Sequence, residues 1–132
     1  MKLILLQSIK FFIVGLTGLF VNYFTSTFFF GIFKIEFIHS TAIGIILSIF
    51  SNFVLNKIWT FNNVDFSLKH LLKQLLIFII ISSLGILIQL SLVYVLVGKG
   101  FSYSVSLIFS ILVAALGNFI LNKKITFDKK LQ

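Results

Sequence analysis

The sequence predicts an all-α, polytopic membrane protein whose four transmembrane helices form two parallel two-helix repeats. Hydrophobic residues make up 59% of the 132 residues and charged residues only 11%, which is far from the balance of a soluble domain. Four stretches lack Lys, Arg, Asp and Glu, and each is close to the roughly 20 residues that cross a bilayer. These stretches are 11–33, 37–56, 74–98 and 100–122. A repeated hexapeptide, described next, predicts the duplication.

The hexapeptide ends the second and the fourth apolar stretch. Residues 52–57 read Asn-Phe-Val-Leu-Asn-Lys, and residues 118–123 read Asn-Phe-Ile-Leu-Asn-Lys. The first and third stretches also correspond, because Phe11, Gly18 and Asn22 align with Phe78, Gly85 and Gln89. Two helices return the chain to its starting side, so the copies share one orientation. We therefore predict a single transmembrane domain over 1–132, with repeats over about 8–61 and about 74–127.

The positions of the lysines predict the orientation in the membrane. If the two ends and the connection 58–73 lie on one side, only Lys34 and Lys99 lie on the other. The first side then carries Lys2, Lys10, Lys57, Lys69, Lys73, Lys123, Lys124, Lys129 and Lys130. The positive-inside rule places that side, with both termini, in the cytoplasm. Despite the net charge of +8, no nucleic-acid partner is expected, because the lysines lie between apolar spans rather than on one basic face.

Each predicted helix carries a stripe of small or polar residues at steps of three or four. The four stripes are Gly15, Gly18, Asn22 and Ser26; Gly44, Ser48, Asn52 and Asn56; Ser82, Gly85 and Gln89; and Ser110, Ala114, Asn118 and Asn122. Small residues let helix backbones approach and amides bond across helices, so we expect the stripes to face one another. Proline is absent, so any unwinding of a span is expected at a glycine.

Catalytic residues, metal ligands and cofactor sites are not predicted. The carboxylates are Glu36, Asp65 and Asp128, all in expected loops or the tail, and none pairs with another by spacing. His39 and His70 fall on opposite sides of the membrane in this topology, and cysteine is absent. No glycine-rich phosphate loop ends in Gly-Lys-Ser/Thr. These absences argue against an enzyme.

The membrane-embedded amides and the adjacent lysines are the candidate site. On a structural interpretation, the amides join helices, the lysines anchor the topology and Trp59 belongs to an aromatic belt. On a functional one, the ammonium groups hold a lipid phosphate, and the amides and the tryptophan bind a sugar. The candidate residues are Asn22, Asn52, Asn56, Lys57, Trp59, Gln89, Asn118, Asn122, Lys123 and Lys124.

These motifs resemble the GtrA-like family of small four-helix membrane proteins over nearly the whole chain. The first helix has Phe11-x-x-Val14-Gly15 with Asn22, and Phe78 opens the third. The second ends in Ser48-x-x-x-Asn52-Phe53-x-x-Asn56-Lys57-x-Trp59-Thr60-Phe61, and the fourth in Asn118-Phe119-x-x-Asn122-Lys123-x-x-Thr126-Phe127. The chain departs from the family pattern in having no arginine and in placing Ile125 where the second copy often has tryptophan.

The resemblance implies a role in cell-surface polysaccharide or teichoic acid glycosylation. It implies that the chain flips a polyprenyl-phosphate-linked monosaccharide across the cytoplasmic membrane. The alternative is a non-transporting subunit that anchors or stabilises a polyprenyl-phosphate glycosyltransferase. Because four helices enclose a narrow interior, we expect a homo-oligomer or a complex with the glycosyltransferase, surrounded by membrane lipids.

Overall fold

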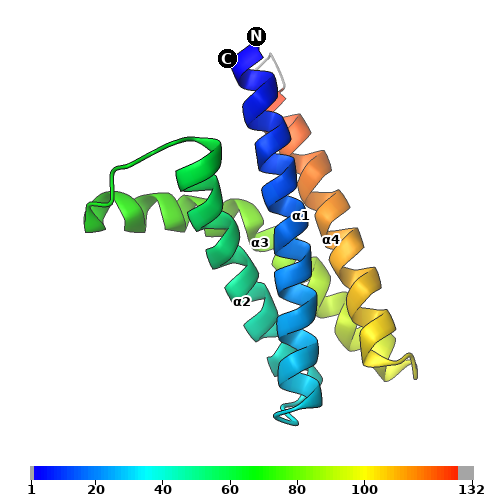
Figure 1. Ribbon diagram of the computed structural model, residues 1–132. Helices are drawn as coiled ribbons and strands as arrows, with labels where there is room; N and C mark the ends of the chain where they lie inside the picture. The colour runs from blue at the N-terminus through cyan, green and yellow to red at the C-terminus, as the bar shows by residue number, and fades with distance from the viewer. Residues whose placement is uncertain (1, 128–132) are drawn as a thin grey trace. The chain divides into compact units, whose positions relative to one another are not determined.

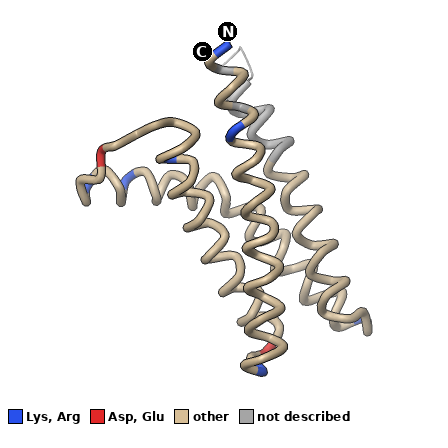
Figure 2. Tube along the Cα trace, viewed as in Figure 1, with Lys and Arg blue, Asp and Glu red and all other residues tan. Residues whose placement is uncertain are grey.

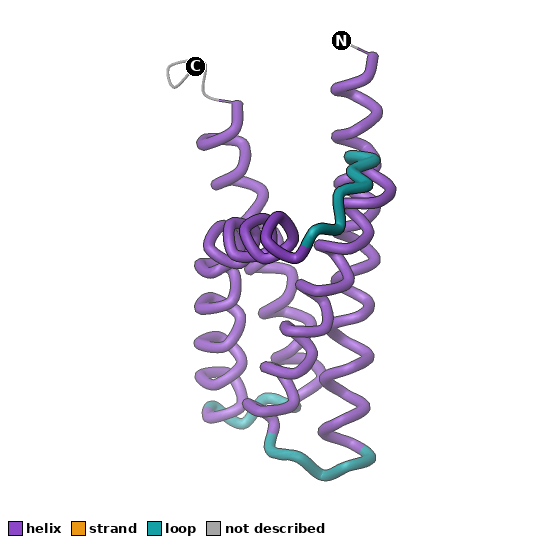
Figure 3. Tube along the Cα trace, turned by 90° about the vertical axis from the view of Figure 1, so that its left-hand side faces the viewer, coloured by secondary structure: helices purple, strands orange, loops and turns teal. Residues whose placement is uncertain are grey.

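The structure, a computed structural model, describes the backbone of residues 2–127 and the side chains of that range except residues 4, 8 and 119–127. The helices are α1 (Lys2–Gly31), α2 (Phe37–Leu55), α3 (Leu68–Gly98) and α4 (Tyr103–Phe127). A π-helical turn, η1 (Asn56–Thr60), continues α2 without a break (Figure 1). Helices and loops account for the whole described backbone (Figure 3).

The predicted all-α class and the four helices are confirmed. By length and composition, Leu5–Gly31, Phe37–Thr60 and Leu68–Gly98 can each cross a membrane. The apolar part of α4 found among the described residues, Tyr103–Asn118, is shorter. Large side chains such as Phe20 and Phe24 are more than half exposed, as expected where lipid rather than water is the solvent. The protein is therefore a multi-pass membrane protein.

The helices extend beyond the charge-free stretches. Helix α1 begins at Lys2, nine residues before the predicted span, because lysine, leucine and glutamine favour helix as much as the apolar residues do. The predicted connection 58–73 is also shorter than expected. Helical turns continue to Thr60 and resume at Leu68, so only residues 61–67 are irregular.

No unwound span tests the expectation about glycine in the described backbone, but the helix type changes at one point after α2. The departure from α-helical geometry lies at η1, which contains no glycine. There the N–H of Phe61 donates to the carbonyl of Asn56 at 2.9 Å, five residues back, and the Thr60 hydroxyl donates to the Asn56 side chain at 2.9 Å. Single π-helical turns of this kind are frequent at functional sites.

The chain divides into two compact units, Met1–Ile80 and Ile81–Gln132. In the first unit, α1 and α2 form an antiparallel pair joined by a short loop, in which Lys34 adopts a left-handed conformation (φ 57°). Residues 68–80 of α3 run crosswise to α1 and α2 (Figures 1 and 3). The rings of Phe53 and Phe78 pack at 5.9 Å and attach this part of α3 to α2.

The small-residue stripes of α1 and α2 face one another, as expected. The Asn52 amide packs on Gly18 so closely that a Cβ at Gly18 would collide with it. Gly44 is packed in the same way against Ser26 and the backbone of Asn22. Ser48 donates from its hydroxyl to the carbonyl of Gly18 at 2.8 Å. Gly15 is the exception in its stripe, because no described atom lies within 4 Å of a Cβ added there.

The second unit contains the rest of α3 and α4. Gly85 lies against the Asn118 amide, which reproduces in this unit the pairing of Gly18 with Asn52. Between the helices, Gly100 takes a left-handed conformation (φ 93°) that glycine adopts without strain. On α4, Ser106 and Ser110 are fully buried and each donates to the carbonyl four residues earlier.

Candidate functional site

Lys57 is the most buried charge in the described part of the chain, with 5% of its surface exposed. Its Nζ donates to the side-chain oxygen of Gln74 at 2.8 Å and to that of Asn63 at 2.9 Å. It also lies 5.3 Å from the ring centroid of Phe66, within range of a cation–π interaction. The ammonium therefore has neutral partners from the irregular segment and from α3. The sequence predicted a lysine whose ammonium lies at the interface, and in this structure it is turned inward.

Asn56 is buried beside Lys57, and its side chain belongs to the π-helical turn. Its Oδ1 accepts from the Thr60 hydroxyl at 2.9 Å, and both residues are at least nine-tenths buried. The turn ends where Asn62 adopts a left-handed conformation (φ 48°), a conformation that asparagine tolerates better than most residues. The N–H of Asn63 then donates to the carbonyl of Lys57 at 2.8 Å. Asn56 thus fixes the geometry that holds Lys57.

Asp65 closes the irregular segment in front of α3. Its Oδ1 accepts from the N–H of Ser67 at 2.9 Å, and its Oδ2 lies 3.9 Å from His70 Nδ1. Hydrogen bonds from the Ser67 backbone and then from its side chain hold the pKa of Asp65 below its usual value, with smaller contributions from the charges of His70 and Lys57. The carboxylate is exposed and orders the loop without contacting Lys57 as an ion pair.

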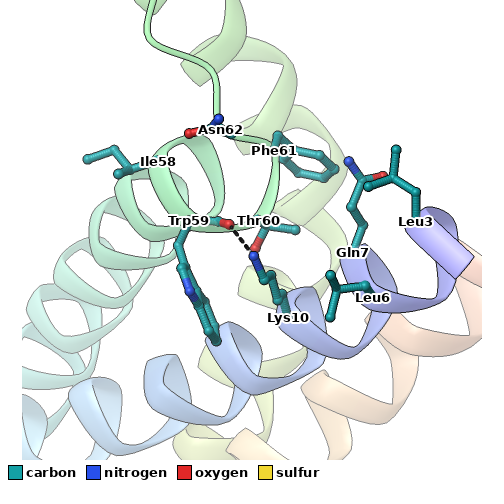
Figure 4. A pocket seen from close by; sticks show the side chains of 9 residues that line it. All are labelled: Leu3, Leu6, Gln7, Lys10, Ile58, Trp59, Thr60, Phe61 and Asn62. Carbon is teal, nitrogen blue, oxygen red and sulfur yellow. Dashed lines mark hydrogen bonds between the residues drawn. The ribbon is translucent and has the colours of Figure 1, made fainter.

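A pocket of about 340 Å³ opens between the start of α1 and η1 (Figure 4). Lys10 points into it and donates from Nζ to the carbonyl of Trp59 at 3.3 Å. The same ammonium lies 5.4 Å from the ring centroid of Trp59. Lysine is a common partner for the free carbonyls at a helix end. The other lining residues are Leu3, Leu6, Gln7, Ile58, Thr60, Phe61 and Asn62.

The interior amides of the first unit lie along the contact between α1 and α2. Asn22 is buried, and its Oδ1 accepts from the Ser26 hydroxyl at 3.3 Å. The Oδ1 of Asn52 is buried and has no hydrogen-bond partner among the described residues. A buried amide oxygen without a partner is rare in folded proteins and calls for an explanation.

The candidate residues of the second unit are less fully described. Gln89 is buried with 5% of its surface exposed, and Asn118 is partly exposed against Gly85. The side chains of Asn122, Lys123 and Lys124 lie outside the described residues. Within the first unit, the structure brings Asn56, Lys57 and Trp59 together on η1, whereas Asn22 and Asn52 lie on α1 and α2.

Charge in the first unit lies near the ends of its helices rather than in their middles (Figure 2). Near η1 the charged or ionisable side chains are the lysines, Asp65 and His70. At the other end of α2, Glu36 at the helix start pairs with His39 in the first turn at 3.1 Å. Over the described range, no cluster of His, Cys, Asp and Glu could hold a metal ion. The arrangement around η1 can bind an anion, an amphipathic molecule or both.

Sequence reasoning missed the partners of Lys57 and the role of Lys10. Asn63 and Gln74 are ordinary polar residues outside the repeated motif, and only the crosswise course of α3 brings Gln74 to Lys57. From the sequence, Lys10 is expected only to contribute to the topology. The position of Lys10 could have indicated this role. In a two-helix hairpin the start of α1 lies beside the end of α2, and Lys10 is one turn from Gln7, which lines the same pocket.

No curated protein matches the chain. The model of the GtrA/DPMS transmembrane domain matches residues 10–127, which covers α1 from residue 10 onward, all of α2, α3 and α4, and every candidate residue. The chain therefore belongs to the GtrA/DPMS transmembrane domain family, which is linked to polyprenyl-sugar-dependent glycosylation.

Proposed function

We propose that the protein flips a polyprenyl-phosphate-linked monosaccharide across the cytoplasmic membrane, for glycosylation of a cell-surface polysaccharide or of teichoic acid. Both termini and η1 would lie on the cytoplasmic side, where a glycosyltransferase makes the lipid-linked sugar. Family membership supports the substrate class, and the polar groups between α1 and α2 support a path for a headgroup.

The single observation that carries the proposal is the Asn52 amide. Its oxygen is buried without a partner among the described residues, although an unsatisfied polar group costs about 1–3 kcal/mol. A sugar hydroxyl passing between the helices would donate to this oxygen and offset that cost. Asn22 and Ser26 lie on the facing helix along the same contact between α1 and α2 and make it polar.

The lysines near η1 would attract the phosphate from the cytoplasmic side. An ammonium binds a phosphate oxygen more strongly than a neutral amide oxygen, because both partners of the bond are then charged. Transport would run downhill, since nothing in the sequence couples it to ATP or to a membrane-embedded carboxylate. Consumption of the sugar outside the membrane would keep it moving in one direction.

One observation favours the second candidate function, a non-transporting subunit of a polyprenyl-phosphate glycosyltransferase. Lys57 is buried, is already bound by Asn63 and Gln74 and lies against Phe66, as expected for a residue with a purely structural role. A subunit of this kind needs a stable cytoplasmic end and an apolar exterior but no path for a substrate.

A vesicle assay tests the proposal against this candidate. The purified chain is inserted into vesicles with a labelled polyprenyl-phosphate sugar, and an enzyme that cannot cross the membrane is added outside to cleave the exposed substrate. Flipping predicts that the protected half of the label becomes cleavable, whereas vesicles without protein retain it. Retention of that half with correctly inserted protein would refute flipping and leave the subunit.

A further inference from the structure

We propose that the pocket between the start of α1 and η1 binds the lipid phosphate. Lys10 supplies the positive charge, and Trp59 supplies an aromatic ring that lines the pocket. The isoprenoid nature of the lipid rests on the proposed function above. The assignment of the phosphate to Lys10, rather than to the lysines of the repeated motif, rests on the contacts of the described residues.

Lys10 is available to an external anion, whereas Lys57 is not. The Nζ of Lys10 has the Trp59 carbonyl at 3.3 Å and the Trp59 ring at 5.4 Å, and both groups are neutral. An ammonium has three donors, so the hydrogen bond to the Trp59 carbonyl leaves donors for a ligand. Lys57, in contrast, is buried and makes two shorter bonds to amide oxygens. A phosphate at Lys57 would have to displace those bonds, but a phosphate at Lys10 would not.

The pocket is amphipathic in the way that a lipid headgroup requires. Gln7 and Asn62 supply amides, while Leu3 and Leu6 form an apolar wall that is at least half exposed. The close-up shows Lys10 pointing toward the turn between Trp59 and Thr60, with Gln7 and Phe61 beside it (Figure 4). A headgroup can therefore meet the ammonium while its chain lies against the apolar side chains at the mouth.

The charge around the pocket suits an anion. None of the lining residues is acidic. Glu36 is paired with His39 at the start of α2, and Asp65 is bonded to Ser67. The Lys10 ammonium lies beside exposed apolar side chains. We therefore propose that the ligand is a phosphate carried by an isoprenoid lipid rather than inorganic phosphate.

Trp59 is the chain's one tryptophan, so its fluorescence reports on this pocket without any label. The full chain is placed in nanodiscs of zwitterionic lipid and titrated with polyprenyl monophosphate, with polyprenol and with inorganic phosphate. We expect polyprenyl monophosphate to change the Trp59 emission saturably, and polyprenol and inorganic phosphate to leave it unchanged. An equal response to polyprenol would show that the pocket recognises only the isoprenoid tail and would refute the phosphate assignment. A response to inorganic phosphate would refute the lipid assignment.

Three variants test the role of Lys10 itself. Lys10→Gln should weaken binding of polyprenyl monophosphate by at least about tenfold, because one charge-assisted bond is lost. Lys10→Arg should retain binding within a few-fold, and Lys73→Gln, which removes an exposed lysine on α3, should bind like wild type. Wild-type binding by Lys10→Gln, or equal weakening in Lys73→Gln, would overturn the proposal.

The two proposals can fail separately. If wild-type protein gives the Trp59 response but vesicles show no flipping, the phosphate-binding pocket is supported and the transport function is refuted. If the wild-type protein flips the substrate in vesicles and Lys10→Gln binds and flips it equally well, the transport function is supported and the pocket assignment is refuted.

Discussion

Gly18 and Gly85 show at the scale of single residues why the stripes contain glycine. Each lies directly against an asparagine amide, Asn52 in one unit and Asn118 in the other. A methyl group has no room in either place, because asparagine is short and its amide is held between two helix backbones. In a membrane, helix association depends on this close packing, since lipid leaves little hydrophobic driving force between helices.

We predict that Gly18→Ala and Gly85→Ala each destabilise the folded protein by about 1–3 kcal/mol, the usual cost of overpacking. Gly15→Ala is the matched control, because a Cβ there meets no described atom within 4 Å, and alanine favours helix. Reversible unfolding in mixed micelles measures the free energies. Equal stability of Gly18→Ala and Gly15→Ala would contradict the close packing of Asn52 on Gly18.

Asp65 gives a pH-dependent prediction. Its pKa is lowered chiefly by the Ser67 backbone, so the carboxylate stabilises the loop at pH values above the ordinary pKa of about 3.9. That contribution is lost only as the pH falls through the lower folded value. We therefore expect the loop to be unaffected around neutral pH and to loosen in strong acid. A carbon NMR titration, with Asp65→Asn to assign the signal, should give a midpoint below 3.9, and a midpoint at or above it would contradict the Ser67 bonds.

At the scale of elements, Lys57 joins parts of the first unit that the sequence keeps apart. It lies on η1, bonds Asn63 in the irregular segment and bonds Gln74 on α3. The Phe53–Phe78 contact described above adds a second attachment of residues 68–80 to α2. The π-helical turn is what aims the ammonium inward.

A double-mutant cycle on Lys57 and Gln74 tests this connection. Lys57→Met and Gln74→Leu should couple by about 1–3 kcal/mol in unfolding free energy, the range of a hydrogen bond to a charged group in direct contact. A parallel cycle of Lys69→Met with Gln74→Leu should show coupling near zero, because Lys69 is exposed and forms no hydrogen bond with Gln74 among the described residues. Coupling near zero in both cycles would mean that Lys57 does not hold α3.

Most of the elements could be predicted from the sequence, because apolar length alone defines a transmembrane helix. The four helices follow from the four charge-free stretches, and the facing stripes follow from helical spacing and residue size. The start of α1 and the length of the connection could not be predicted. Lysine and glutamine favour helix, so a helix can continue past the apolar residues that define the transmembrane span. The π-helical turn was missed because it depends on the Thr60–Asn56 bond rather than on a glycine.

The site was predictable only in part, for the same physical reason. The repeated Asn-x-x-x-Asn-Lys spacing identified Asn52, Asn56 and Lys57, which share one end of α2 and its continuation. It could not identify Gln74 or Lys10, whose partners lie far away in the sequence. Contacts of this kind are decided by the course of a helix through space and leave no local pattern.

At the scale of the whole molecule, the lysine distribution predicts the orientation. The chain has no cysteine, so single cysteines can be introduced without removing any. We predict that an impermeant maleimide labels Lys34→Cys and Lys99→Cys in intact cells, but labels Asp65→Cys only after permeabilisation. Labelling of Asp65→Cys in intact cells would place η1 outside and reverse the proposed direction of entry.

The central claim is that a chain of four helices, with a polar contact between α1 and α2, carries a sugar headgroup across the membrane by itself. The most direct test is the initial rate at which a polyprenyl-phosphate sugar becomes cleavable in vesicles that contain only this protein, for wild type and for Asn52→Leu. Leucine removes the unpartnered amide oxygen at little cost in stability, so we predict a folded variant that flips at least about tenfold more slowly. Equal rates for a folded Asn52→Leu protein and wild type, or no flipping by wild type, would contradict the account.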